Sequence, residues 1–247
     1  MRILAADSWL LRDGGAVALD AHRTRFLASL TASPRTDPAE AAAFWDAAIA
    51  ALPRAGTWFP RLECRAVGEA DAQRTELVLR VRPAPALHET VVLATHPGPD
   101  PRRTPQVKGP DLERLTAVRT AAQGHGADDA ALLDASGAVA ETATANLVWW
   151  RGDVLCVPED GIPQLPGVTL RALRGLAVGA GIEVRPERAT PADLAGCAVW
   201  TLNALHGIRR VERWVDGPAL DTAPARLAPW RARLEELRRP LPAPVPA

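Results

Sequence analysis

The chain has 247 residues, of which 47% are hydrophobic and 23% are charged. These fractions are ordinary for a soluble globular protein, and the length allows one large domain or two smaller ones. Basic and acidic residues number 29 each, so nothing in the overall charge favours nucleic acid or an anionic membrane as a partner. The sequence has no apolar run that could cross a bilayer and no signal-peptide pattern at its start. We therefore expect a cytoplasmic protein.

The first hundred residues combine predicted helices and strands. Asp37-Pro38 is typical of a helix start, because Asp caps free backbone N–H groups and proline suits the first helical position. Pro53 ends this helical pattern. Four apolar residues between these points recur at helical spacing and predict a buried face: Trp45, Ala48, Ile49 and Leu52. Alternation over residues 77–81 and an apolar run over 91–93 predict strands.

Four prolines fall within residues 96–105 and exclude regular structure there. We take this segment as the boundary between two domains. The expected division is a small N-terminal α/β domain over residues 1–97, a Pro-rich linker over 98–107 and a larger domain over 108–238. Residues 239–247 are rich in proline and alanine and are expected to form a disordered tail.

The second half is rich in predicted short strands. A hairpin turn at Arg151-Gly152-Asp153 joins two of them. The expected strands cover residues 130–133, the region of Val139, and residues 146–150, 154–157, 182–184 and 198–202. Helices are expected from Asp111 to about 122, from the turn at 165–169 to about 180, and from about Pro229 to Arg238. This mixture indicates an α/β or α+β fold.

The three cysteines are Cys64, Cys156 and Cys197, an odd number of widely spaced residues. Neither a Cys-x-x-Cys pair nor a Cys/His spacing typical of a metal site is present, so we predict no bound metal. We interpret the cysteines as reduced structural thiols, in keeping with a cytoplasmic location.

Lys108 is the only lysine, whereas the chain has 28 arginines. A guanidinium stays protonated at physiological pH, but a desolvated lysine amine can lose its proton and form a Schiff base. Lys108 is therefore a candidate for amine chemistry, with a chance loop residue as the alternative interpretation. The carbonyl cofactor most often used with amine substrates is pyridoxal phosphate (PLP).

PLP requires two further features, a carboxylate beside its pyridine nitrogen and backbone N–H groups at a helix start around its phosphate. Glu141 follows a predicted turn between strands, and Leu165-Pro-Gly-Val-Thr169 is a glycine turn into a helix. Each feature alone has an ordinary interpretation, a surface carboxylate at a strand end and a capped helix start.

The order of these features resembles the class IV (fold type IV) PLP-dependent aminotransferase family. The stretch from Asp129 to Leu147, which contains Glu141, is similar to the family's signature. The motifs Leu165–Thr169 and Asn203–Val211 follow in the family's order, and Asp20–Phe26 is similar to its first helix. The family includes branched-chain and D-amino-acid aminotransferases and aminodeoxychorismate lyase. The resemblance covers nearly the whole chain and implies a two-domain, D-amino-acid-aminotransferase-like fold, with a small N-terminal α/β domain and a larger domain rich in short strands.

The resemblance also implies roles for individual residues. Lys108 would form the internal aldimine with PLP and shuttle the proton, and Glu141 would pair with the pyridine nitrogen. The phosphate would be bound by the Arg25 side chain and by the helix start at Val168 and Thr169. Asn203 and Ala204 would lie on the loop that faces the phosphate and the substrate. Ser8 and His206 would line the substrate pocket.

Several positions depart from the family pattern. The chain has no tyrosine, yet aminotransferase members commonly place one a few residues after the lysine. Val148, Val157 and Leu170 replace an aromatic, a threonine and a basic residue that are usual in the family. Family members also carry a strand and loop ahead of the position of Ser8, which form part of the pocket's substrate side. His22, in the first helix, is expected to be a packing residue.

Three functions are compatible with the sequence. The first is a lyase like aminodeoxychorismate lyase, which releases pyruvate to leave 4-aminobenzoate for folate synthesis. The missing tyrosine and the Asn203-Ala-Leu205 loop favour it. The second is an aminotransferase of branched-chain or D-amino acids with a 2-oxo acid acceptor. The third is a degenerate, non-catalytic paralogue, against which the retained Lys108 and Glu141 argue. The resemblance also implies a small amino-group substrate and a homodimer whose active site lies at the domain cleft.

Overall fold

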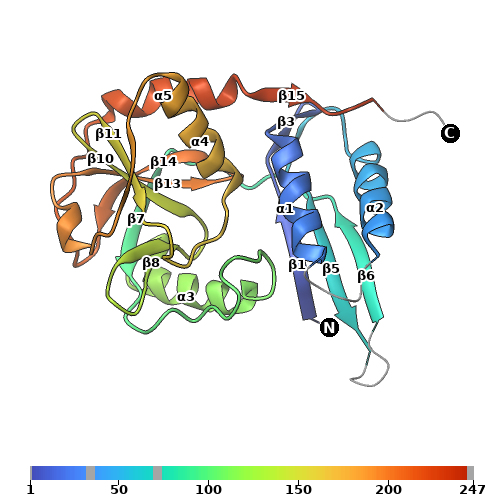
Figure 1. Cartoon of the computed structure of the whole chain (residues 1–247), viewed down its shortest axis with the longest axis horizontal. Helices are drawn as coiled ribbons and strands as arrows, with labels where there is room; N and C mark the ends of the chain where they lie inside the picture. Colours follow the sequence, from blue (N-terminus) through green and yellow to red (C-terminus); the bar gives the residue numbers. More distant parts are fainter. Residues whose placement is uncertain (1, 32–36, 69–73, 244–247) are drawn as a thin grey trace. The chain divides into compact units, whose positions relative to one another are not determined.

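The computed structural model describes residues 2–31, 37–68 and 74–243 (Figure 1). The chain forms two compact units. Three segments build unit 1, namely Met1–Ala86, Val107–Pro110 and Leu237–Ala247; two build unit 2, namely Leu87–Gln106 and Asp111–Glu236. The chain therefore passes between the units at four points, whereas the expected division had a single linker over residues 98–107.

One sheet of unit 1 consists of three long antiparallel strands, in the order β1 (Arg2–Ser8), β5 (Arg61–Val67) and β6 (Arg74–Arg80). Figure 1 shows α1 (Leu19–Thr31) beside β1, with α2 (Pro38–Ala50) next to it. The predicted start of α2 is confirmed, because the Asp37 side chain accepts a hydrogen bond of 2.8 Å from Ala39 N. Its predicted apolar face is buried, and the Trp45 ring packs 5.3 Å from that of Trp9 and 6.0 Å from that of Phe26.

A second sheet of unit 1 includes a strand from the C-terminal part of the chain. Its order is β15 (Arg238–Pro240), β3 (Gly15–Val17), β2 (Leu11–Arg12) and β4 (Thr57–Trp58). Leu241 continues the edge, since its N–H donates to Gly14 O at 2.7 Å and its side chain is buried.

This strand changes two expectations about the C-terminal part of the chain. Residues 239–241 of the expected disordered tail are held against unit 1, while residues 244–247 lie outside the described part. The last helix, α5 (Leu227–Glu235), ends before Arg238, because from Arg238 onward the backbone bonds to β3 instead of continuing a helix.

Unit 2 is built on one large mixed sheet. The strands lie in the order β12, β11, β10, β13, β14, β7, β8, β9, and an additional pairing of β9 with β10 closes the part between them into a barrel. Their bounds are β7 (Thr90–Thr95), β8 (Asp129–Leu133), β9 (Val139–Thr142), β10 (Asn146–Arg151), β11 (Val154–Pro158), β12 (Val184–Glu187), β13 (Ala198–Asn203) and β14 (Gly207–Trp214). The predicted hairpin is confirmed, since Arg151 pairs with Val154 across a turn in which Gly152 has a φ of +59°.

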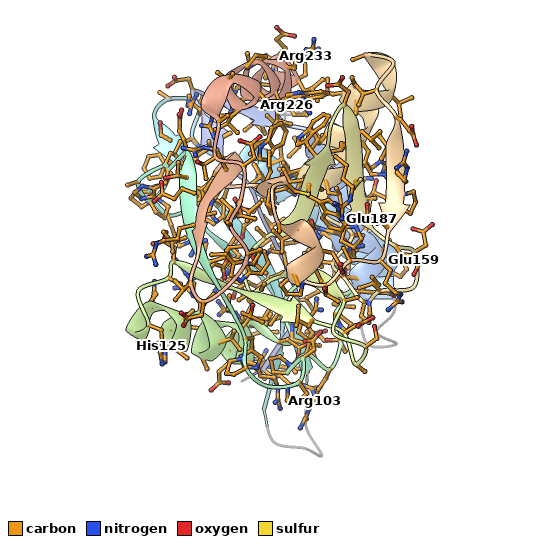
Figure 2. All side chains as sticks on the ribbon, turned by 90° about the vertical axis from the view of Figure 1, so that its left-hand side faces the viewer. Arg103, His125, Glu159, Glu187, Arg226 and Arg233 are labelled. Atoms are coloured by element: carbon orange, nitrogen blue, oxygen red, sulfur yellow. The ribbon has the colours of Figure 1, made fainter. Side chains whose placement is uncertain are left out.

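Three helices pack on this sheet. Figure 1 shows α3 (Leu112–Gly124) beside β8, whereas α4 (Val168–Gly179) lies near α5. Trp150, Trp200 and Trp230 form a cluster with ring centroids 5.3 to 6.4 Å apart. Arg226 lies 4.5 Å above the Trp150 ring and Arg233 lies 5.0 Å from the Trp230 ring, and both arginines are labelled at the top of Figure 2.

The three cysteines lie in the core. Cys64, Cys156 and Cys197 are all buried. Burial raises the pKa of the Cys156 thiol to about 12, so this group stays protonated at neutral pH. No helix in the described part of the chain combines the length and apolarity needed to span a membrane.

Candidate active-site residues

Lys108 belongs to unit 1, in the four-residue segment Val107–Pro110. Its carbonyl oxygen accepts a hydrogen bond of 2.6 Å from Ala6 N in β1. Gly109 has a φ of +132°, and a Cβ there would lie 2.9 Å from both the Ala5 carbonyl carbon and Ala6 N. Glycine is required for this close approach of two backbones. The segment that carries the only lysine is therefore fixed against β1.

The end of β1 holds a buried charge that the sequence did not reveal. Asp7 is fully buried and accepts hydrogen bonds from Arg25 Nε at 2.9 Å and from Arg25 Nη2 at 2.7 Å. Its Oδ1 atom also lies 2.8 Å from His22 Nδ1 and accepts from Ser8 N at 2.7 Å. Burial would raise the pKa of Asp7, but the charges and hydrogen bonds of His22 and Arg25 outweigh it and hold that pKa well below its usual range. Asp7 therefore stays ionised and orients Arg25.

Two predicted site residues and one predicted packing residue thus meet at this carboxylate. Arg25 is the predicted phosphate ligand and Ser8 a predicted pocket residue, and those roles stay predictions. His22 packs as expected, with its ring centroid 5.4 Å from that of Trp9. In addition to packing, its ring nitrogen contacts Asp7.

Glu141 lies in unit 2, near the end of β9, and is 6% exposed. It is directly opposite Asn146 in the pairing that closes the sheet. Asn146 Nδ2 donates to Glu141 Oε2 at 2.9 Å, and Leu165 N donates to Glu141 Oε1 at 3.1 Å. The Asn146 amide also bonds Leu165 O at 3.0 Å. The fold therefore joins the signature stretch to the Leu165–Thr169 motif at this carboxylate.

Arg102 is a third partner of Glu141, and sequence reasoning missed it. Its Nη1 atom forms an ion pair with Glu141 Oε1, and its side chain is 2% exposed. Its Nε atom donates to both carboxylate oxygens of Asp100, at 2.9 and 3.0 Å, and Nη2 donates to Pro163 O at 2.8 Å. Burial opposes the charge of Arg102, but Asp100 and Glu141 outweigh that effect and raise its pKa. The residue predicted to lie in a passive linker is thus a permanent buried cation.

The start of α4 presents backbone donors. Gly167 is the N-cap residue, and no side chain caps the helix. Val168 and Thr169 open the helix and are buried. The first N–H groups of a helix have no partner within it and favour an anion such as phosphate. A Cβ on Gly167 would lie 1.7 Å from Asn146 Oδ1, so glycine is needed for Asn146 to reach Glu141.

The loop between β13 and β14 is stabilised by the side chain of Asn203, the last residue of β13. Asn203 Oδ1 accepts hydrogen bonds from Leu205 N at 3.1 Å and from His206 N at 2.8 Å, which shapes the turn around Ala204. His206 Nδ1 accepts a hydrogen bond from His88 N at 3.3 Å. Burial and the nearby charge of Arg209 lower the pKa of His206 to about 3, so its ring is neutral at pH 7.

Comparison with known proteins identifies the family of this chain. A family model described as amino-transferase class IV matches residues 4–214. The chain therefore belongs to this family, and the expectation of a class IV PLP-dependent enzyme is confirmed at the level of the family. A comparison with curated proteins found no match.

Solved structures confirm the expected fold class. A branched-chain aminotransferase from Thermoproteus uzoniensis, solved with norvaline, superposes with a TM-score of 0.79 at 18% identity, covering 94% of this chain and 83% of that one. An aminotransferase from Brucella abortus bound to PLP gives 0.77 at 21% identity, with 94% and 88% covered. A Legionella pneumophila protein assigned as a 4-amino-4-deoxychorismate lyase gives 0.76 at 18% identity, with 94% and 90% covered. At these identities the likeness establishes the fold, which includes a small N-terminal sheet region and a larger barrel.

Proposed function

We propose that this protein is a PLP-dependent aminotransferase that binds the cofactor covalently through Lys108. Its substrates would be a branched-chain or D-amino acid and a 2-oxo acid. The observation that carries the proposal is the arrangement around Glu141, a buried carboxylate oriented by Asn146 and Leu165 N beside an uncapped helix start. A carboxylate next to free backbone N–H groups fits a ring that carries both a basic nitrogen and a phosphate.

The residues of the chain would have different roles in cofactor binding and proton transfer. Glu141 would orient the pyridine ring and hold its nitrogen protonated, and Val168 N and Thr169 N would bind the phosphate. Arg25, oriented by Asp7, would add a charged phosphate contact. Asn203 and Ala204 would support the phosphate side, and Ser8 and His206 would line the substrate pocket. Lys108, when its amine is neutral, would move the proton at the substrate's α-carbon. Bound PLP would supply an electron sink for the charge left by that proton.

A lyase reaction on aminodeoxychorismate, with release of pyruvate and 4-aminobenzoate for folate synthesis, is the second candidate. It is favoured by the absence of tyrosine from the chain, since the aminotransferase branch commonly uses one against the cofactor. A non-catalytic paralogue is disfavoured by the fully formed contacts of Glu141. We also propose a homodimer in the cytoplasm, on the family resemblance and the composition, and its oligomeric state can be measured by light scattering.

The decisive experiment uses the fact that Lys108 is the only lysine. Protein incubated with PLP is reduced with borohydride, and peptide mass spectrometry should find the cofactor on Lys108. Lys108→Arg keeps the positive charge but cannot form the link, and it should lose both the label and the visible absorption of bound PLP. Wild-type protein that takes up no PLP would contradict the proposal.

The same preparation separates the two reactions. An aminotransferase converts its amino acid only when a 2-oxo acid is added to complete the cycle. Release of pyruvate from aminodeoxychorismate without any 2-oxo acid would instead identify the lyase. We expect the first result, and Lys108→Arg serves as the inactive control in both assays.

A further inference from the structure

Arg102 lies where the sequence predicts only a linker, yet its guanidinium is among the most constrained groups of unit 2. Its side chain is 2% exposed, and hydrogen bonds to Asp100 and to Pro163 O fix its plane. With Nε and Nη2 held in this way, Nη1 points at Glu141 Oε1. A guanidinium held by several neighbours has little freedom left to lose when it forms this last contact.

Glu141 is oriented from two other directions as well. Leu165 N donates to Oε1, and Asn146 Nδ2 donates to Oε2. The main-chain and amide donors fix the plane of the carboxylate, but they carry no charge. Arg102 is the charged donor among these three, so of the three it favours the ionised form of Glu141 most strongly.

The charges of the cluster also suit a cationic neighbour. Arg102 contacts two carboxylates, Asp100 and Glu141, so one positive charge faces two negative charges. A protonated pyridine ring beside Glu141 would bring the cluster towards neutrality, which favours a buried site.

We propose that Arg102 is a positioning residue that keeps Glu141 ionised, so that the proton shared between Glu141 and the pyridine nitrogen of PLP stays on the ring. This inference rests on the function proposed above. The guanidinium cannot take up or release a proton at neutral pH, so it stabilises the carboxylate without competing for that proton. Without it, a buried carboxyl group holds its proton more tightly, and the proton would move from the ring nitrogen to Glu141. A neutral ring withdraws electrons less well from a bound substrate.

The test measures the protonation state of the ring nitrogen directly. PLP labelled with ¹⁵N in the ring is bound to wild-type protein, Arg102→Gln, Arg102→Lys and Arg103→Gln, and the ring ¹⁵N chemical shift is recorded at pH 7. Wild type should give a pyridinium-type signal, and Arg102→Gln a pyridine-type signal. Arg102→Lys restores the charge and should move the signal back towards wild type.

Arg103→Gln is the matched control. Arg103 is the next residue, is exposed, and lies at the lower edge of Figure 2. Its backbone N–H donates a hydrogen bond to Asp111 Oδ2 at 3.0 Å, and this contact does not depend on its side chain. Its replacement should leave both the ring signal and the affinity for PLP unchanged. Arg102→Gln should bind PLP roughly ten to a hundred times more weakly, the range seen when a group that orients a ligand-binding residue is removed.

The outcomes are distinguishable from failure of the proposed function. If wild-type protein takes up no PLP, the proposed function fails. If it binds PLP and gives a pyridine-type signal, the inference about Arg102 is overturned without any variant, even when Arg102→Gln does not fold. An Arg102→Gln protein with the wild-type signal and affinity would also overturn it. Thermal unfolding of the cofactor-free variants separates a loss of fold from a change at the ring.

Discussion

The charge of the buried Asp7 carboxylate depends on its neighbours. Because burial opposes ionisation and His22 and Arg25 favour it more strongly, its pKa in the folded protein lies below the ordinary value near 4. Such a group stabilises the fold at any pH above its unfolded pKa, and the stabilisation is lost as pH falls through the folded pKa. We predict that Asp7→Asn lowers the free energy of unfolding at pH 7 by about 3 kcal/mol, since it leaves buried basic groups without a carboxylate.

The pH dependence of that difference is the check. The difference between the melting temperatures of wild type and Asp7→Asn should be largest at neutral pH. It should shrink as pH falls below about 4, because the carboxyl group then takes up a proton in the unfolded chain while it stays ionised in the folded protein. Asp46→Asn is the control, because that side chain is 66% exposed and its ion pair with Arg23 spans 3.9 Å. It should change stability by less than about 0.5 kcal/mol. A gap for Asp7→Asn that stays constant down to pH 3 would contradict the linkage.

Residue types indicated some candidate site residues, whereas others became visible only through contacts between residues far apart in the sequence. Glu141 and the Leu165–Thr169 turn could be named as candidates because PLP chemistry needs a carboxylate and backbone N–H groups, and because their order in the chain resembles that of the class IV family. Arg102 could not be found, because the chain has 28 arginines and the one that matters is chosen by a contact across 39 residues. Asp7 was missed for the same reason, since its partners are 15 and 18 residues away.

At the scale of elements, the start of α4 is important because its N-cap residue, Gly167, contacts the side chain that orients Glu141. Gly167 and Asn146 approach so closely that a Cβ on Gly167 would overlap Asn146 Oδ1. We predict that Gly167→Ala displaces the Asn146 side chain, costs about 2 kcal/mol in buried hydrogen bonds and weakens PLP binding. Calorimetry and PLP titration measure the two effects.

The same helix provides a control of opposite sign. Gly175 lies in α4, is exposed, and a Cβ there would meet nothing within 4 Å. Gly175→Ala should therefore stabilise the protein by about 0.5 to 1 kcal/mol through helix propensity and leave PLP binding unchanged. If both variants behave alike, the close approach at Gly167 has no energetic importance.

Element boundaries were predictable where the signal is local. Asp37-Pro38 set the start of α2 and Gly152 set the hairpin between β10 and β11, and both signals act within a few residues. The end of α5 had no such signal. Arg238 continues a helical pattern in the sequence, but in the fold it pairs with Val17, which is more than two hundred residues away.

At the scale of the whole molecule, the segments that form each unit are not contiguous in the sequence. The segment Val107–Pro110, which contains Lys108, belongs to unit 1, although residues of unit 2 precede and follow it in the sequence. Its attachment depends on the Ala6–Lys108 hydrogen bond and on the closeness that Gly109 allows. A proline-rich segment indicates that a boundary is near, but it carries no information about which unit takes each residue beyond it.

The C-terminal strand gives the last test, because it ties the end of the chain to unit 1. Removing residues 237–247 eliminates β15, the hydrogen bond from Arg238 Nη1 to Gly15 O at 2.8 Å, and the buried side chain of Leu241. We predict a loss of roughly 3 kcal/mol or more, confined to unit 1. Hydrogen exchange should therefore speed up at the amides of β2 and β3 and stay unchanged in β10 and β13. Equal acceleration in both units would mean that the strand stabilises the chain as a whole instead of unit 1.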